Sequence, residues 1–273
     1  MNEHEQMLTS LLDCRRVDLY VDPLELTTEQ KKQYTHMVDR WKSGEPLQYI
    51  IGHVDFSNTK LFVNEHVLIP RPETELLVEI AITKLQNLKN RPLQILDLGT
   101  GSGNIAIALA RKIDECHVTA VDISPKAISL AESNAKKNFV EKKITFVRSD
   151  MFKFLEKDDN SSLKFDMIIS NPPYIKSKDM LTLPRDVRRE PHIALDGGKD
   201  GLDFYRGIID KAGQLLTENG FLLFEIGEEQ AQEIRKMIQS FPYFQNIFVD
   251  RDYADQDRFV YTQYKLTETR LSN

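Results

Sequence analysis

The chain contains little cysteine, with only Cys14 and Cys116 among its 273 residues. The two lie far apart in the sequence and outside any spacing typical of a metal site, so we expect buried or free thiols rather than a disulfide. The six histidines are also scattered along the chain. These absences argue against a disulfide-stabilised scaffold, and we predict no metal centre.

Long apolar runs and excess positive charge are also missing. No apolar stretch approaches the length that a helix needs to cross a bilayer, and the first residues, MNEHEQ, lack the basic and apolar regions of a signal peptide. We therefore expect a cytoplasmic protein with no membrane partner. The formal net charge of -6 offers no general attraction to nucleic acid. The small basic cluster of Arg185, Arg188 and Arg189 is more typical of a solvated surface or local ion pairs than of a binding patch.

Glycine is sparse, with 12 residues, yet three glycines lie within the five positions Gly99, Thr100, Gly101, Ser102 and Gly103. Apolar runs at 93–98 and 105–110 flank them, which predicts a strand, a glycine loop and a helix. The spacing is Gly-x-Gly-x-Gly rather than that of dinucleotide enzymes, and no Lys-Ser or Lys-Thr pair follows as in a P-loop. Asp122 ends the next predicted strand, roughly twenty residues later, where a carboxylate can accept hydrogen bonds from ribose hydroxyls. The pattern predicts a nucleoside site without a pyrophosphate.

A second motif, Asn171-Pro172-Pro173-Tyr174, directly follows the predicted buried strand at 165–170. Proline has no backbone N–H, so this tetrapeptide is stiff and rich in carbonyl acceptors. The Asn171 side-chain oxygen and the Pro172 carbonyl can together accept both hydrogens of a planar NH2 group, while the Tyr174 ring packs on its plane. We call these four residues the amide clamp and predict that they are catalytic. Because the clamp orients the nitrogen and stabilises the charge that develops on it, we expect no obligatory general base.

The spacing of apolar residues indicates two domains. Residues 1 to about 45 are predicted to be helical, with one helix opened by a capping box at Thr27 and Gln30. Residues 53–69 alternate apolar and polar side chains, which indicates a β-hairpin. We therefore divide the chain into a helical domain with its hairpin connector, residues 1–70, and a main domain, residues 71–273.

The main domain alternates predicted strands and helices, which is typical of an α/β fold with a mostly parallel sheet covered on both faces. Seven strands are expected near 93–98, 116–122, 143–148, 165–170, 219–226, 244–249 and 257–264. The last two should be antiparallel, because the segment between them is too short for a crossover helix. Ligands bind at the carboxyl edge of such sheets, where Asp97, Asp122, Asp150 and Asn171 each end a strand. The long segment at 175–199 is predicted to be a functional loop.

These motifs are similar to those of class I S-adenosylmethionine-dependent methyltransferases that act on a planar nitrogen. Further segments resemble the peptide chain release factor glutamine N5-methyltransferases, the HemK/PrmC family, over nearly the whole chain: EPLQYIIG at 45–52, IPRPETE at 69–75, EP at 190–191, ALDGG at 194–198 and DGL at 200–202. The resemblance implies the Rossmann-like methyltransferase sheet with its last strand antiparallel. It also implies the cofactor S-adenosyl-L-methionine and the product S-adenosyl-L-homocysteine.

The same resemblance assigns parts of the cofactor to residues. The glycine loop would admit the methionine part, Asp122 would hold the ribose, and Asp150 with Met151 would border the adenine, where relatives often carry an aromatic residue instead of Met151. The expected cofactor-binding residues are Asp97, Gly99, Thr100, Gly101, Ser102, Gly103, Asp122, Asp150, Met151 and Asn171.

We accordingly expect methyl transfer to the side-chain nitrogen N5 of the glutamine in the Gly-Gly-Gln motif of class I peptide chain release factors. We expect a monomer, and we expect its helical domain to recognise the protein substrate. The tetrapeptide also occurs in amino-methyltransferases of nucleic acid bases, so an adenine N6-methyltransferase is an alternative, although the acidic charge argues against a direct nucleic-acid substrate. A glutamine methyltransferase of a ribosomal protein is a second alternative, and a non-catalytic cofactor-binding module is a third.

Overall fold

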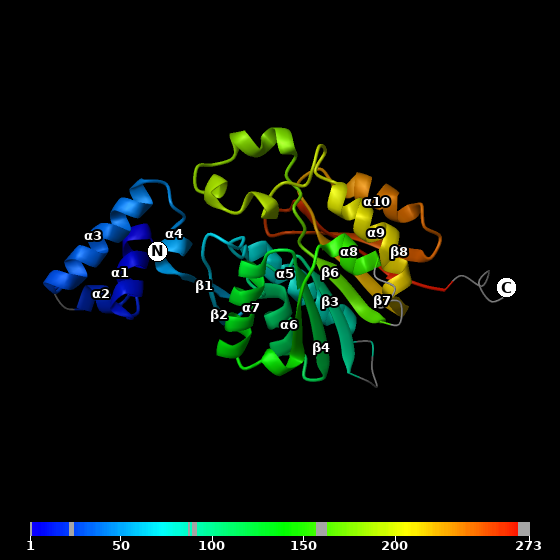
Figure 1. Ribbon diagram of the computed structural model, residues 1–273, viewed down its shortest axis with the longest axis horizontal. Helices are drawn as coiled ribbons and strands as arrows, with labels where there is room; N and C mark the ends of the chain where they lie inside the picture. The colour runs from blue at the N-terminus through cyan, green and yellow to red at the C-terminus, as the bar shows by residue number, and fades with distance from the viewer. Residues whose placement is uncertain (1, 22–24, 87, 89–91, 157–162, 267–273) are drawn as a thin grey trace.

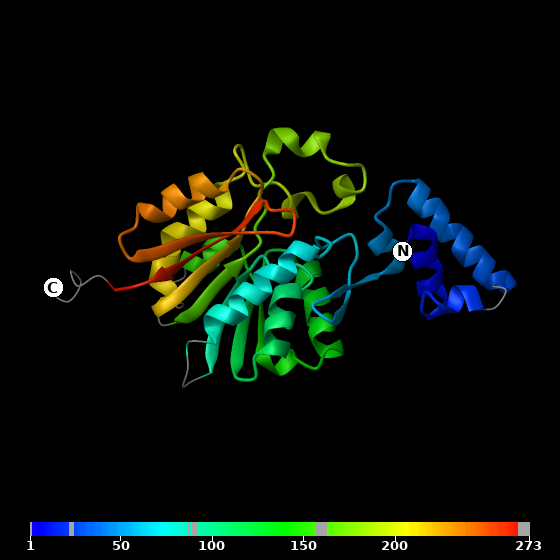
Figure 2. The same ribbon diagram turned by 180° about the vertical axis from the view of Figure 1, so that it is seen from behind.

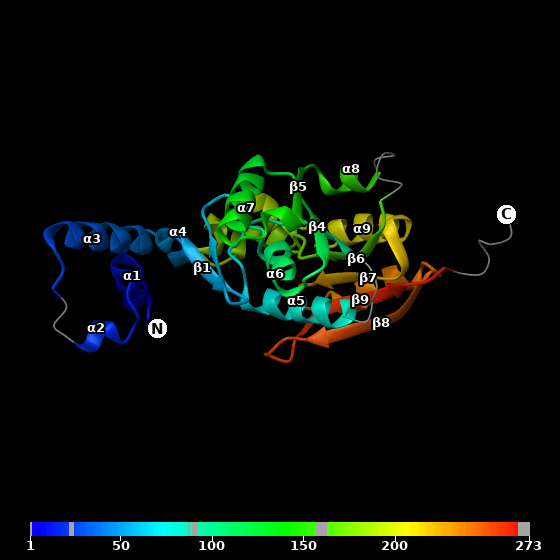
Figure 3. The same cartoon turned by 90° about the horizontal axis from the view of Figure 1, so that it is seen from below.

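The computed structural model describes residues 2–21, 25–86, 88, 92–156 and 163–266. A seven-stranded sheet with helices on both faces makes up the larger part, and the first helices of the chain lie at one end of the molecule (Figure 1). Seen from below, these helices project away from the sheet (Figure 3). The predicted α/β class is confirmed.

The order of the strands in the sheet is β5-β4-β3-β6-β7-β9-β8. The first five are parallel: β5 (Ile144–Arg148), β4 (Cys116–Asp122), β3 (Leu93–Leu98), β6 (Phe165–Ser170) and β7 (Leu216–Glu225). The last strand in the sequence, β9 (Asp257–Tyr264), lies between β7 and β8 (Phe244–Arg251) and is antiparallel to both. The predicted seven strands and their antiparallel final pair are confirmed. The largest boundary error is at β7, which begins at Leu216 because it continues through a bend where Asn219 has a φ of 66°.

Two apolar cores flank the sheet. The helices α5 (Pro72–Leu85), α6 (Asn104–Lys112) and α7 (Pro125–Lys137) contribute to one core, and α5 crosses the strands in the rear view (Figure 2). The helices α8 (Met151–Glu156), α9 (Asp203–Leu215) and α10 (Ala231–Gln239) contribute to the other. Successive residues of β3 alternate between them, with Ile95 in the first core and Leu96 in the second. This double burial explains why the strands read as continuous apolar runs.

The N-terminal helices are α1 (Glu3–Leu12), α2 (Asp18–Val21), α3 (Thr28–Lys42) and α4 (Leu47–Ile51). The predicted capping box is confirmed, because Thr27 and Gln30 exchange side-chain and backbone hydrogen bonds at the start of α3. A hairpin of β1 (His53–Phe56) and β2 (Thr59–Phe62) follows. The predicted hairpin extended to residue 69, which is wrong: residues 63–69 have no strand partner among the described residues.

Asn134 of α7 joins the hairpin to the main sheet. Its side chain is fully buried, and its Nδ2 donates to the carbonyl oxygens of Phe62 and Ser102, both at 2.9 Å. Its Oδ1 accepts from the Phe62 N–H, also at 2.9 Å. Phe56 and Leu61 of the hairpin belong to the same core as α5 and α6. One side chain therefore supports both the hairpin and the glycine loop.

The remaining described elements are short 3₁₀ helices: η1 (Glu141–Lys143), η3 (Ser177–Thr182), η4 (Val187–Arg189) and η5 (His192–Ala194). The last three belong to the 175–199 segment, which rises beyond the carboxyl edge of the sheet (Figure 1). None of the described helices has the length and apolar composition that a membrane crossing requires. Cys14 and Cys116 are both free thiols. The described residues contain no cluster of His, Cys, Asp and Glu side chains arranged to hold a metal ion.

Candidate active site

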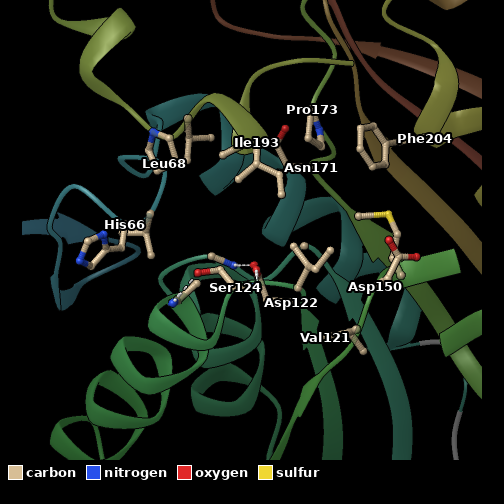
Figure 4. A pocket seen from close by; sticks show the side chains of 18 of the residues that line it. His66, Leu68, Val121, Asp122, Ser124, Asp150, Asn171, Pro173, Ile193 and Phe204 are labelled. Atoms are coloured by element: carbon tan, nitrogen blue, oxygen red, sulfur yellow. Dashed lines mark hydrogen bonds between the residues drawn. The ribbon is translucent and has the colours of Figure 1, made fainter. Parts of the chain in front are cut away.

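A cavity of about 160 Å³ opens at the carboxyl ends of the parallel strands (Figure 4). Seven of the predicted site residues line it: Gly99, Gly101, Asp122, Asp150, Met151, Asn171 and Pro173. Residues that the sequence did not single out line it as well, including His66, Leu68, Ile123, Ser124, Ile193 and Phe204. The other predicted residues are absent from this wall: Asp97, Thr100, Ser102, Gly103, Pro172 and Tyr174.

The glycine loop joins β3 to α6, and its conformation requires glycine. Gly101 has a φ of 54°, and a Cβ atom built on it meets no atom within 4 Å, so the loop exposes its backbone to open space there. At Gly103, with a φ of 83°, a Cβ would lie 3.0 Å from Ile107 Cδ1 and 3.1 Å from Ala131 Cβ. The first position leaves room for a ligand, and the second lets the loop pack closely on α6 and α7.

Asp122 holds the glycine loop in place. Its Oδ2 accepts a hydrogen bond from the Gly101 N–H, and its Oδ1 accepts one from the Ser124 N–H, each at 2.9 Å (Figure 4). Burial raises the pKa of this carboxyl, and the backbone hydrogen bonds oppose that effect. The carboxylate therefore both fixes the loop and faces the cavity, where its remaining lone pairs can accept hydrogen bonds from ligand hydroxyls.

Three buried polar atoms near the loop and the amide clamp have no hydrogen-bond partner among the described residues: Asp97 Oδ1, Ser102 Oγ and Asn171 Oδ1. Buried polar atoms are normally satisfied, so an unpaired atom on a cavity wall is a candidate ligand contact, and of these three residues only Asn171 lines a cavity. The other oxygen of Asp97, Oδ2, accepts a hydrogen bond from the Thr100 hydroxyl at 2.7 Å. Burial raises the pKa of Asp97 to about 7. Asp97 and Thr100 thus support the loop from behind rather than from the cavity wall.

The raised pKa of Asp97 predicts a pH-dependent stability. The Asp97 carboxyl binds its proton more tightly in the folded protein, where its pKa is about 7, than in the unfolded chain, where its pKa is 3.8. Protonation of Asp97 therefore contributes fully to the free energy of unfolding below pH 3.8, and this contribution is lost as pH rises through about 7. The stability of the wild type should fall as pH rises, whereas Asp97→Asn carries no titrating group at this position. We therefore expect the free energy of unfolding of Asp97→Asn, relative to that of the wild type, to increase by about a few kcal/mol between about pH 5 and pH 8. Urea denaturation at both pH values measures this. A difference independent of pH, or an equal change in the exposed control Asp114→Asn, would contradict the assignment.

Asp150 and Met151 lie at the start of α8. Asp150 Oδ1 accepts hydrogen bonds from the N–H groups of Phe152 at 2.9 Å and Lys153 at 3.2 Å, so it caps this helix. Phe204 of α9 lines the same cavity and stacks on Phe152 with a centroid distance of 5.6 Å and an interplanar angle of 17°. Phe204 therefore brings an aromatic ring to the wall that carries Met151. No local sequence signal marks Phe204, because it comes from a distant helix.

Asn171 lies where two cavities meet. It lines the larger cavity with the glycine loop, and also a smaller one of about 120 Å³ that is bordered by Pro172, Tyr174 and Arg71. The structure thus brings the amide clamp to the wall between two spaces. A group entering the smaller cavity can meet a ligand of the larger one at Asn171.

Gln230 fixes the end of the clamp. Its Nε2 donates to the carbonyl oxygens of Tyr174 and Gly201, both at 3.1 Å, and its Oε1 accepts from the Gly227 N–H at 2.9 Å. A Cβ atom on Gly201 would lie only 2.3 Å from the Tyr174 carbonyl oxygen. The backbone at Gly201 therefore packs directly against the backbone of the clamp. The sequence prediction missed Gln230, which no motif distinguishes.

The 175–199 segment is attached to the N-terminal part of the chain. Glu190, with only 5% of its surface exposed, pairs with Arg71 and accepts a hydrogen bond from the Ile69 N–H at 2.9 Å. Arg189 Nη2 donates to the Ser43 carbonyl at 3.4 Å, and the Arg185 side chain lies against Gly44. Two members of the basic cluster therefore make local contacts with the turn between α3 and α4.

The comparisons with known proteins agree with this geometry. A family model described as "Methyltransferase domain" matches residues 89–249, and one described as "PrmC N-terminal domain" matches residues 2–52. A "Release factor glutamine methyltransferase" from Moorella thermoacetica is 39% identical over 234 residues, which cover 86% of this chain and 80% of that protein. A protein of the same name from Thermodesulfovibrio yellowstonii is 38% identical over 265 residues, covering 96% and 92%. The solved structure of a methyltransferase from Pyrococcus furiosus matches with a TM-score of 0.54 at 14% identity, covering 88% of this chain and 100% of that one, which supports the fold alone.

Proposed function

The chain belongs to the family of release factor glutamine methyltransferases, and on this premise we propose that it methylates the side-chain nitrogen N5 of the glutamine in the Gly-Gly-Gln motif of class I peptide chain release factors. The observation that carries the proposal is Asn171 Oδ1, a buried acceptor without a partner among the described residues, on the wall between two cavities. An acceptor in this position suits a substrate that offers an N–H group.

We propose that the larger cavity receives S-adenosyl-L-methionine. The exposed loop backbone at Gly99 and Gly101, the carboxylate of Asp122 and the wall of Met151 and Phe204 offer polar contacts at one end and apolar contacts at the other. We propose that the glycine loop, supported by Asp97, Thr100, Ser102 and Gly103, receives the methionine part. Asp122 then accepts the ribose hydroxyls, and Asp150, Met151 and Phe204 border the adenine. When bound there, the cofactor supplies a methyl group on a sulfonium centre.

Asp122→Ala is expected to weaken cofactor binding by about 1–3 kcal/mol. The ribose hydroxyls would lose a charged acceptor, and the Gly101 N–H would lose the partner that orders the loop. Calorimetric titration with S-adenosyl-L-methionine gives the dissociation constant. Glu132→Ala, on α7 away from the cavity, is the control. An unchanged affinity in folded Asp122→Ala would mean that the ribose does not reach Asp122.

The smaller cavity receives the glutamine side chain in this proposal. The Asn171 side-chain oxygen and the Pro172 carbonyl accept the two hydrogens of the substrate amide, which turns its nitrogen lone pair toward the methyl group. As the nitrogen becomes positive, the same two acceptors stabilise it. Tyr174 packs on the amide plane, and burial raises the pKa of its phenol, which therefore stays neutral. The methylated nitrogen is strongly acidic, so its proton can leave to water without a dedicated base.

The direct test is mass spectrometry of a purified class I release factor after incubation with the enzyme and cofactor. One added methyl group on the glutamine of the Gly-Gly-Gln motif supports the proposal, and a substrate in which this glutamine is replaced by alanine should gain none. Methyladenine formed in DNA or RNA without peptide modification would support the adenine N6-methyltransferase instead. Modification of a ribosomal protein alone would support the other glutamine methyltransferase.

We also propose that residues 1–70 recognise the protein substrate and that the enzyme acts as a monomer. The N-terminal helices project from the molecule on the side of the 175–199 segment, and Ser43 and Gly44 contact that segment (Figures 1 and 3). A release factor that inserts its Gly-Gly-Gln loop at Asn171 can therefore touch both parts at once.

Removal of residues 1–45 is expected to lower the rate of methylation of an intact release factor by at least about tenfold, because contacts outside the reacting glutamine contribute to transition-state binding. Cofactor affinity should stay within about threefold, and this also reports that the shortened chain is folded. A short peptide carrying Gly-Gly-Gln is the matched substrate, and both enzymes should methylate it at similar rates. Equal rates of the two enzymes on the intact release factor would refute the recognition role.

A further inference from the structure

The Asn171 amide has one bonded end and one free end. Its Nδ2 donates to the Thr74 hydroxyl at 3.3 Å, whereas its Oδ1 is buried and has no partner among the described residues. The amide clamp requires this orientation, because only the oxygen can accept a substrate N–H. The function proposed for Asn171 therefore depends on what prevents a half-turn of its side chain.

Thr74 supplies a directional contact. Its hydroxyl donates to Glu225 Oε2 at 2.7 Å, and it has only one hydrogen to give. Toward Asn171 the Thr74 oxygen can then act only as an acceptor, so it selects the NH2 end of the amide. Rotating Asn171 by a half-turn would place two acceptor oxygens against each other.

Glu225 is the fixed end of this chain of hydrogen bonds. It follows β7 residue Phe224, which is paired with Ser170 of β6, so the sheet register places Glu225 beside Asn171. Only 2% of Glu225 and 1% of Thr74 is exposed, so water does not compete with these contacts. Three elements therefore meet at one amide: the first turn of α5, the end of β6 and the end of β7.

We propose that Thr74 and Glu225 are positioning residues. They hold the Asn171 oxygen toward the substrate nitrogen by binding the NH2 end of the amide, through the hydrogen-bond chain Asn171 to Thr74 to Glu225 and through the direct contact between Asn171 and Glu225. This role rests on the proposed methyl transfer to an amide nitrogen. Neither residue lines the larger or the smaller cavity. Both act through Asn171.

The ionisation state of Glu225 determines which group donates and which accepts in the hydrogen bonds between Asn171, Thr74 and Glu225. Burial raises the pKa of this carboxyl to about 7. The Thr74 hydroxyl, Arg258 of β9 and a direct contact with the Asn171 side chain oppose that effect, while Glu73 of α5 raises the pKa further. The Tyr174 and Tyr205 phenols are further titratable groups that interact with Glu225. When protonated, Glu225 can itself donate to Thr74, whose hydrogen is then free to point at Asn171. Catalysis should therefore decline as pH falls through the Glu225 pKa.

Steady-state kinetics of release factor methylation by the full-length enzyme test the proposal. Thr74→Val keeps the shape but removes the hydroxyl, and we expect kcat to fall at least about tenfold, with KM for the release factor and Kd for the cofactor within about threefold of the wild type. Thr74→Ser restores the hydroxyl and should restore most of kcat. Thr83→Val, an exposed position on the same helix, should leave kcat unchanged. A kcat of Thr74→Val within about twofold of the wild type, or equal losses in Thr74→Val and Thr74→Ser, would overturn the proposal.

Glu225→Gln provides a second variant of nearly the same shape. In the wild type kcat should rise with pH up to about 7, and in Glu225→Gln this rise should be absent while kcat is low throughout. A wild-type pH profile retained by Glu225→Gln would overturn the role of Glu225.

A readout that needs no substrate separates this proposal from the proposed function. The side-chain NH2 signals of Asn171, identified in nitrogen-15 NMR spectra by their loss in Asn171→Ala, should shift in Thr74→Val and return toward wild-type positions in Thr74→Ser. Unchanged signals in Thr74→Val would overturn the hydrogen-bond chain. If the wild type methylates no release factor but the signals shift as expected, the substrate assignment fails and the positioning of Asn171 stands.

Discussion

Asn171→Ala is expected to lower the turnover of release factor methylation by at least about 100-fold while cofactor affinity stays within a few-fold of the wild type. Alanine removes the side-chain amide oxygen of the clamp, and the Pro172 carbonyl alone cannot fix the rotation of the substrate amide. The contact matters most in the transition state, where the nitrogen gains positive charge. The loss should therefore appear in kcat rather than in KM.

Single-turnover measurements with saturating cofactor isolate the methyl-transfer step. Asn138→Ala, which removes an asparagine side chain at the far end of α7, is the control and should retain wild-type turnover. Asn171→Ala must keep the wild-type circular dichroism spectrum and cofactor affinity. Turnover near the wild-type value in such a protein would show that the Asn171 oxygen does not hold the reacting nitrogen.

Gly201→Ala is expected to lower turnover by at least about tenfold, because a Cβ atom would overlap the Tyr174 carbonyl oxygen at 2.3 Å and lie 2.8 Å from Gln230 Nε2. The overlap involves backbone, so the clamp itself must move. Gly201 also has a φ of 78°, which costs an alanine about 1 kcal/mol. Displacing the clamp changes the position of the two acceptors relative to the methyl group.

Gly52→Ala is the control that separates the clash with the clamp from the cost of placing alanine at a positive φ. Gly52 has a similar φ of 84°, but a Cβ atom there meets nothing within 4 Å. We expect Gly52→Ala to lose about 1 kcal/mol of stability in urea denaturation and to keep its turnover. Equal turnover of Gly201→Ala and Gly52→Ala would mean that contact with the clamp is unimportant for catalysis.

The strands of the sheet could be predicted from the sequence, because burial on both faces makes each central strand an apolar run. It was also sufficient for residues 53–62, where alternation marks the hairpin. It failed for residues 63–69, whose buried Val63, Val67 and Ile69 alternate like a strand but pack against Ala127 in a core of their own. Apolar periodicity reports burial, and here burial occurs without strand pairing.

The residues that line the cavity were predictable where a motif is contiguous and not where distant segments come together. Asp122 and Asn171 lie next to strands that the sequence marks clearly, and both line the cavity. Glu225 is paired through Thr74, which is 151 positions away in the sequence. No local sequence pattern predicts such a contact, because it forms where α5 crosses the ends of β6 and β7.

The position of β9 has a consequence for how the protein is made on the ribosome. β7 and β8 are synthesised first, yet both pair with β9, and Phe224 and Glu225 face Val260 and Phe259. Until residues 257–264 emerge from the exit tunnel, the growing chain carries an unpaired and strongly apolar β7 edge, which is open to contact with chaperones or with other nascent chains. Completion of the sheet, and with it the placement of Glu225 beside Asn171, is therefore delayed until β9 has emerged from the ribosome.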